Sequence, residues 1–175
     1  MQQSLASTTT TPESAEDDGP PGPRRALRHR STDQALQLEA PAQFEAIVDS
    51  HLARSRRQGA PLVVLRLTVD SVQGPGGYAA GHEVEQRVLA ECAHRLCSRV
   101  RSVDQVVRIG GRGFGVVLVG ANEAAGRAVS LRLALAGGGL YRLGNQLLDL
   151  RLRVGHAAFP EAGAGGAALV RAATF

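Results

Sequence analysis

Two short apolar runs, separated by a glycine-rich tetrapeptide, constrain the fold of this chain more than any other segment. The runs are residues 105–109 and 115–119, and Gly110-Gly111-Arg112-Gly113 stands between them. Valine, isoleucine and leucine in runs of this length favour strands, and the glycines allow the tight turn of a hairpin. The sequence therefore predicts a β-hairpin, with Arg101 and Asp104 just before its first strand.

Along the rest of the chain, apolar periodicity predicts further helices and strands. Pro41 interrupts a helical pattern that starts near Leu36, so the long helix is expected to begin around Ala42. The expected elements in order are a helix to residue 58, a strand at 62–69, a loop at 74–77, a helix at 80–100, the hairpin, a helix at 122–136, strands near 140–143 and 147–156, and the start of a helix at 167–173. This order predicts an α/β sandwich, an α+β arrangement with a central, mainly antiparallel sheet flanked by helices.

Residues 1–30 differ in composition from the remainder of the chain. They are rich in threonine, serine, proline and glycine, and they hold an acidic cluster followed by a basic one (Glu13, Glu16, Asp17 and Asp18, then Arg24, Arg25, Arg28 and Arg30). A segment without apolar periodicity cannot bury enough surface to offset the cost of ordering. We therefore expect a disordered tail over 1–30 and one domain over 31–175.

The composition narrows the choice of partners. All 20 basic residues are arginine, against 16 acidic residues, and aromatic residues make up only 3% of the chain. Arginine reads guanine edges and phosphates through its planar fork, whereas the shortage of aromatic rings argues against a surface that stacks single-stranded nucleic acid. Cys92 and Cys97 fit no disulfide or metal spacing, and no apolar run is long enough to span a bilayer. We expect a cytoplasmic protein, without nucleic-acid binding or membrane insertion.

Several segments together resemble the GGDEF domain of diguanylate cyclases, over the stretch from Asp33 to Ala173. The strongest match is Asp104-x-Val106-x-Arg108-x-Gly110-Gly111. The segment Val154-Gly155-His156-Ala157-Ala158-Phe159-Pro160 resembles a late strand of the family, and Asp33-x-x-Leu36-x-Leu38 resembles its short entry motif. The resemblance implies the palm fold of nucleotide cyclases and a role in bacterial signalling by cyclic di-GMP.

The chain departs from the family pattern where the resemblance places metal-binding and catalytic carboxylates. The first aspartate of the Asp-x-Asp motif is Thr68 here, which leaves Asp70, and the third and fourth signature positions are Arg112 and Gly113. A guanidinium about 4 Å from a divalent cation costs about 8 kcal/mol at an effective dielectric constant of about 20. Phosphoryl transfer depends on charge supplied by metal. We therefore expect no catalytic residue, no magnesium site, no cofactor and no enzyme activity.

The resemblance also implies a site for the nucleotide. Arg101-x-x-Asp104 matches the pair with which many family members bind cyclic di-GMP, and Arg132 stands where the family adds an arginine from the next helix. Guanine O6 and N7 suit a bidentate arginine, and guanine N1–H and N2–H suit a carboxylate. On a helical turn, a spacing of three residues would put Arg101 and Asp104 on one face. The expected function is a catalytically inactive domain that binds cyclic di-GMP as a signalling effector.

Two structural alternatives stand beside this interpretation. Arg101 and Asp104 could form a surface salt bridge worth about 0–1 kcal/mol, and Arg132 could lie on a solvated helix face. The domain would then be a protein-interaction scaffold that binds no nucleotide. Under the nucleotide hypothesis we expect a protein partner, and also a homodimer bridged by ligand, because cyclic di-GMP often binds such family sites as a stacked pair.

Overall fold

The computed structural model describes residues 36–38 and 40–174, so the predicted tail over 1–30 and Asp33 of the entry motif lie outside the described residues. The described elements in chain order are β1 (Leu36–Leu38), α1 (Pro41–Gln58), β2 (Leu62–Gln73), the 3-10 turn η1 (Pro75–Gly77), α2 (His82–Cys97), β3 (Gln105–Ile109), β4 (Gly113–Val119), α3 (Glu123–Gly137), β5 (Gly139–Leu143), β6 (Gln146–Phe159) and α4 (Gly166–Ala172).

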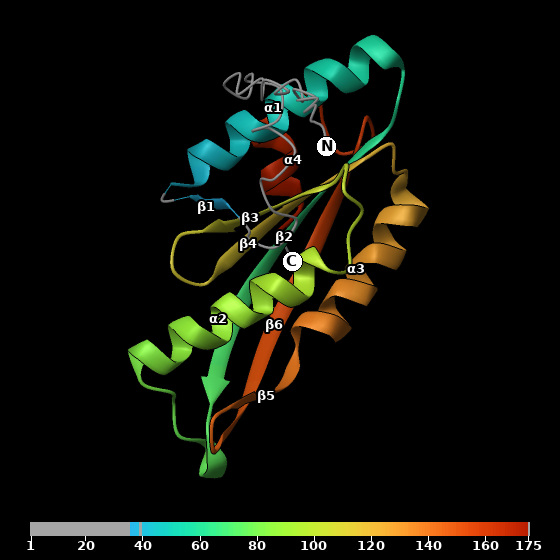
Figure 1. The fold of residues 1–175 in the computed structure, drawn as a ribbon. Coiled ribbons are helices and arrows are strands. Elements are labelled where there is room, and N and C mark those ends of the chain that lie inside the picture. Colours follow the sequence, from blue (N-terminus) through green and yellow to red (C-terminus); the bar gives the residue numbers. More distant parts are fainter. Residues whose placement is uncertain (1–35, 39, 175) are drawn as a thin grey trace, which may run out of the picture. The chain divides into compact units, whose positions relative to one another are not determined.

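The strands form one sheet in the order β1-β3-β4-β2-β6-β5. The long strand β2 lies at its centre and pairs antiparallel with β4 on one side and β6 on the other. Of the strands in the described residues, only β1 pairs in parallel, with β3. Helices α2 and α3 cover one face of the sheet, and α1 and α4 cover the other (Figure 1). The predicted α/β sandwich with a mainly antiparallel sheet is confirmed.

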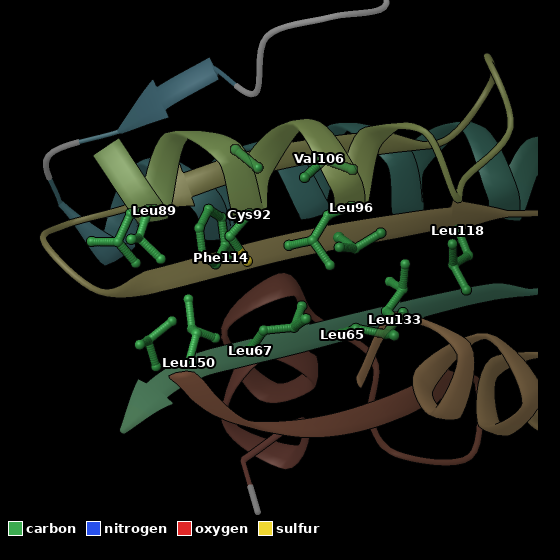
Figure 2. Close-up of a cluster of buried hydrophobic side chains, with 14 of the residues drawn as sticks. Leu65, Leu67, Leu89, Cys92, Leu96, Val106, Phe114, Leu118, Leu133 and Leu150 are labelled. Atoms are coloured by element: carbon green, nitrogen blue, oxygen red, sulfur yellow. The ribbon is translucent and has the colours of Figure 1, made fainter. Parts of the chain in front are cut away.

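Alternation along β2 divides the core into two layers. Successive side chains of a strand point to opposite faces, so Val63, Leu65 and Leu67 face α2 and α3, while Leu62 and Val64 face α1 and α4. The first layer is the larger and includes leucines from α2, α3 and three strands (Figure 2). In the second layer the fully buried helix residues are Phe44, Val48 and Leu52 of α1 and Leu169 of α4. Because both faces are covered, the first four residues of β2, 62–65, are apolar and buried on both sides.

Local sequence signals explain where the helices begin and end. Pro41 is the first residue of α1, where the missing N–H costs nothing because the first turn has no partner for it. Gly59 ends the same helix in the left-handed region, with φ 61°. Asn122 caps α3, since its Oδ1 accepts a hydrogen bond from the backbone N of Ala125 at 3.0 Å.

The structure corrects several of the predicted boundaries. Residues 36–38 form a strand rather than part of a helical pattern, because their backbone pairs with β3. The central strand runs four residues beyond Val69, along β6 alone, and shifts register around Asp70. Helix α2 spans 82–97, shorter than the predicted 80–100, and leaves residues 98–104 as turns. Among the described residues, no helix has the length and hydropathy to span a bilayer.

Candidate functional site

The turn between α2 and β3 carries two of the predicted site residues, Arg101 and Asp104. It is a β-turn rather than a helical turn, closed by a hydrogen bond from the Asp104 backbone N to the Arg101 carbonyl oxygen at 3.0 Å. The Arg101 side chain is exposed. No ion pair joins the two side chains in the part of the chain that is described. The surface salt bridge that stood as the structural alternative is therefore not formed between them.

The Asp104 carboxylate instead fastens this turn to the neighbouring strand. Its Oδ2 accepts the backbone N–H of Arg101 at 2.9 Å, and its Oδ1 accepts the backbone N–H of Val119 at 3.1 Å. Val119 is the last residue of β4, so one side chain links the start of the hairpin to its end. An ionised carboxylate has about four lone-pair sites, so these bonds leave acceptor capacity on both oxygens.

Arg132 of α3 contacts the segment just before this turn. Its guanidinium donates a hydrogen bond to the carbonyl oxygen of Arg99 at 2.9 Å. Arg99 lies two residues before Arg101, so the structure brings Arg132 to the segment that carries the other two predicted residues. A guanidinium has five N–H donors, and this bond uses one of them. Arg99 and Arg132 also line one groove of about 390 Å³.

At the opposite end of the hairpin, the turn Gly110–Arg112 lies beside Thr68 and Val69 of β2. Thr68 of β2 and Gly113 of β4 are direct partners in the antiparallel ladder. These are two of the positions that the sequence resemblance assigned to metal-binding carboxylates. Their adjacency shows that the two sequence departures fall at one place in the fold.

Arg112, the other departure in this turn, forms an ion pair with α2. Its Nε donates to Oε1 of Glu85 at 2.7 Å, and its Nη2 donates to Oε2 of the same carboxylate. The Glu85 side chain is nearly buried, at 10% exposure. The hydrogen bonds from Arg112 hold the pKa of Glu85 below its ordinary value, against burial, which acts to raise it.

A second ion pair surrounds the remaining aspartate, Asp70. Arg153 of β6 donates from Nε to both carboxylate oxygens at 2.9 Å and from Nη2 to Oδ1 at 2.8 Å. Asp70 lies where the register between β2 and β6 shifts, which turns its side chain out of the regular ladder. The Arg153 guanidinium therefore contacts both carboxylate oxygens of Asp70.

Sequence reasoning missed Glu85, Arg99 and Arg153. Glu85 could have been found, because it falls in the buried stripe of α2 beside Val88 and Leu89, where a carboxylate needs a partner. Arg99 contributes only its backbone carbonyl oxygen, which any residue could supply. Arg153 reaches Asp70 because β6 pairs with β2. Neither residue could therefore be recognised from the sequence.

The comparisons with known proteins agree with this architecture. The family model described as "Diguanylate cyclase, GGDEF domain" matches residues 30–174. No curated protein sequence matches the chain.

Solved structures with the same fold come from several bacteria. An EAL/GGDEF domain protein from M. capsulatus is 31% identical, with a TM-score of 0.58, and the match covers 70% of this chain and 79% of that one. The GGDEF domain of PA1120 (TpbB or YfiN) from Pseudomonas aeruginosa is 24% identical, with a TM-score of 0.64 and 83% of each chain covered. Diguanylate cyclase SiaD from the same organism, solved with its activator SiaC, is 22% identical, with a TM-score of 0.59, and the match covers 85% of this chain and 60% of that one.

Proposed function

The chain belongs to the diguanylate cyclase GGDEF-domain family, and from this premise we propose that it is a catalytically inactive member that binds cyclic di-GMP as a cytoplasmic signalling receptor. The proposal has two parts, which rest on opposite ends of the hairpin. The loss of synthesis rests on the turn Gly110–Arg112 and its neighbours. The binding of nucleotide rests on the turn Arg101–Asp104 and on Arg132.

The residues around the first turn do not fit the divalent cation that diguanylate synthesis implies. Mg²⁺ prefers carboxylate, phosphate and water oxygens in octahedral geometry. Here Thr68 supplies a hydroxyl, Gly113 supplies no side chain, and Arg112 brings a positive charge that Glu85 neutralises. The carboxylate of Asp70 is engaged on both oxygens by Arg153. The two carboxylates near this turn, Glu85 and Asp70, are thus each paired with an arginine. The site therefore does not fit a divalent cation, and it supports no metal-dependent catalytic step.

The observation that carries the binding proposal is the hydrogen bond from Arg132 to the Arg99 carbonyl oxygen. It brings an arginine from α3 to within two residues of Arg101, so that two guanidinium groups and the Asp104 carboxylate belong to one surface. The exposed Arg101 can donate two N–H groups to guanine O6 and N7. The acceptor capacity left on Asp104 suits guanine N1–H and N2–H, and Arg132 keeps further donors for phosphate.

Isothermal titration with cyclic di-GMP tests the site. We expect saturable heat with the wild-type chain, and affinity about tenfold weaker or worse in Arg101→Ala and Arg132→Ala, since a bidentate base contact is worth about 1–3 kcal/mol. Arg57→Ala on α1 is the matched control, because Arg57 is exposed on the other face of the sheet. Affinity unchanged in Arg101→Ala, or an equal loss in Arg57→Ala, would disprove the site.

Chromatographic analysis of reactions with GTP and Mg²⁺ tests the catalytic half of the proposal. We expect GTP to remain and no cyclic di-GMP to form, whatever the result of the titration. Formation of cyclic di-GMP would refute inactivity.

A receptor of this kind needs a means of passing its signal on. The solved structure of SiaD contains a protein activator, and we propose that this chain likewise acts through a protein partner. We propose in addition that a stacked pair of ligand molecules joins two copies of the chain. Sedimentation with and without cyclic di-GMP checks that part, since a bridged dimer forms only with ligand.

A further inference from the structure

The outer side of α3 carries an apolar stripe that no described element covers. Figure 1 shows α3 on the outside of the sheet, beyond β6. Its inward residues are Gly126, Ser130, Leu133 and Gly137. The outward stripe consists of Ala124, Ala128, Leu131 and Leu135, all exposed. Leu131 is 64% exposed and Leu135 is 75% exposed, the two most exposed leucines of the described residues.

The spacing of this stripe is that of a coiled-coil seam. Its residues follow one another at intervals of four, three and four, which are the a and d positions of a heptad repeat. With Ala128 and Leu135 at a and Leu131 at d, Arg127 falls at g and Arg132 at e. The side chains of Arg127 and Arg132 therefore flank the seam on its two sides. The groove beside the seam is lined by Arg99, Ala128, Leu131, Arg132, Leu135 and Ala136.

The positive charges of Arg127 and Arg132 beside the seam determine which kind of helix can bind there. Residues at e and g of one helix meet those of its partner, and like charges there oppose pairing. In a parallel pair of α3 helices, Arg127 of one copy would meet Arg132 of the other. In an antiparallel pair each arginine would meet its own counterpart. A second copy is therefore disfavoured in both orientations, whereas glutamate or aspartate at the partner's flanks would complement both arginines.

We propose that the outer face of α3 is a docking surface for an acidic amphipathic helix of a partner protein. Leu131 and Leu135 supply the apolar contact, and the small side chains of Ala124 and Ala128 let the partner helix approach closely. Arg127, Arg132 and the nearby Arg99 select for acidic flanks. This surface does not depend on the binding of cyclic di-GMP, although Arg132 belongs to both sites.

Designed peptides of about three heptads test the surface on the full chain. One peptide carries leucine at a and d with glutamate at e and g, a second has lysine at e and g, and a third keeps the glutamates with serine at a and d. Fluorescence anisotropy measures the binding of each. We expect the first peptide to bind and the other two to bind at least about tenfold more weakly, a difference of about 1.4 kcal/mol.

Two double variants and their matched controls locate the site. Leu131→Gln with Leu135→Gln is expected to weaken the glutamate peptide about tenfold or more, whereas Leu140→Gln with Leu147→Gln, at exposed leucines of β5 and β6, should leave its affinity unchanged. Arg127→Glu with Arg132→Glu should reverse the preference toward the lysine peptide. The corresponding change at Arg54 and Arg57 of α1 should not. All eight positions are exposed, so each variant should fold, and circular dichroism and the melting temperature check this.

Three outcomes would overturn the proposal. They are failure of the glutamate peptide to bind, equally tight binding of the lysine peptide, and a loss of affinity in the control variants as large as that in the α3 variants. A dimer in sedimentation equilibrium that the double leucine variant dissociates would show that a second copy is the occupant instead. Failure of cyclic di-GMP binding has no bearing on any of these measurements, so the two proposals fail separately.

Discussion

Thr68 of β2 and Gly113 of β4 are partners in the antiparallel ladder, so two positions far apart in the sequence share one place on the sheet. Neither carries a carboxylate. Their neighbours, Arg112 and Asp70, are each held by an ion pair to another element, α2 and β6 respectively. Side chains of α2 and β6 therefore hold the charged groups at this end of the hairpin.

The fit around Gly113 predicts a measurable cost for any side chain there. A Cβ at this position would lie 2.8 Å from the carbonyl oxygen of Ile109, which is part of the backbone and cannot yield cheaply. We expect Gly113→Ala to lower the free energy of unfolding by about 1–3 kcal/mol. Gly111→Ala is the matched control, because nothing lies within 4 Å of its added Cβ. Urea denaturation compares the two, and equal stability of both variants would show that the turn is not adapted to glycine.

The ion pair between Arg112 and Glu85 predicts a pH-dependent contribution to stability. Arg112 lowers the pKa of Glu85 in the folded chain. The contribution to stability is therefore complete above the pKa of glutamate in the unfolded chain, about 4.3. It is lost as the pH falls through the lower pKa of the folded chain. At pH 7, Arg112→Ala should cost about 1–3 kcal/mol, since it leaves a nearly buried carboxylate without its partner.

Denaturation of wild type and Arg112→Ala between about pH 3 and pH 7 checks this linkage. The difference in stability should shrink toward the acid end, where Glu85 becomes neutral. The double variant Glu85→Gln with Arg112→Ala should show little of that dependence. A difference that stays constant with pH would mean that the charge of Glu85 contributes nothing.

Arg101 should act in binding alone, whereas Asp104 should have a structural role in addition to its binding role. Asp104 joins the backbone N–H groups of Arg101 and Val119, so Asp104→Ala should lower the free energy of unfolding by about 2 kcal/mol. The exposed Arg101 side chain should contribute less than about 0.5 kcal/mol. Thermal unfolding of Arg101→Ala and Asp104→Ala measures both, and a large loss of stability in Arg101→Ala would show that this side chain is structural.

Because Arg132 belongs to the nucleotide site and to the flank of the α3 seam, the two ligands should compete. With cyclic di-GMP at saturation, the glutamate peptide should bind more weakly, and the peptide should weaken the nucleotide by the same factor. Anisotropy of the peptide across a nucleotide titration measures this coupling. Independent binding would place the two ligands on surfaces that share no residue, although each could still bind by itself.

The sequence predicted the elements of the fold correctly where a residue type strongly favours one structural position. Pro41 fixed the start of α1, Asn122 capped α3, and the valine-rich central strand was recognisable because both of its faces are buried. Leu36–Leu38 was not, because a three-residue strand that pairs in parallel with β3 depends on a segment about 70 residues away. A pattern of period 3.6 can arise by chance over so few residues.

The candidate site was predictable only in part. Arg101, Asp104 and Arg132 were predicted from the family resemblance, and in the structure Arg132 donates a hydrogen bond to the carbonyl oxygen of Arg99, two residues before Arg101. The helix predicted to run to residue 100 ends at Cys97 instead. The alternative of a salt bridge between Arg101 and Asp104 is not formed, because the Asp104 carboxylate accepts backbone N–H groups. Arg153 could not be predicted from the sequence, since its pairing with Asp70 depends on the register of β2 against β6.

Calorimetric titration of the full chain with cyclic di-GMP in the presence of EDTA tests the central claim most directly. If the chain reads the nucleotide with arginine and aspartate side chains alone, saturable heat will appear without metal, and the affinity will be the same when Mg²⁺ replaces EDTA. The absence of heat, or heat that appears only with Mg²⁺, would contradict the account.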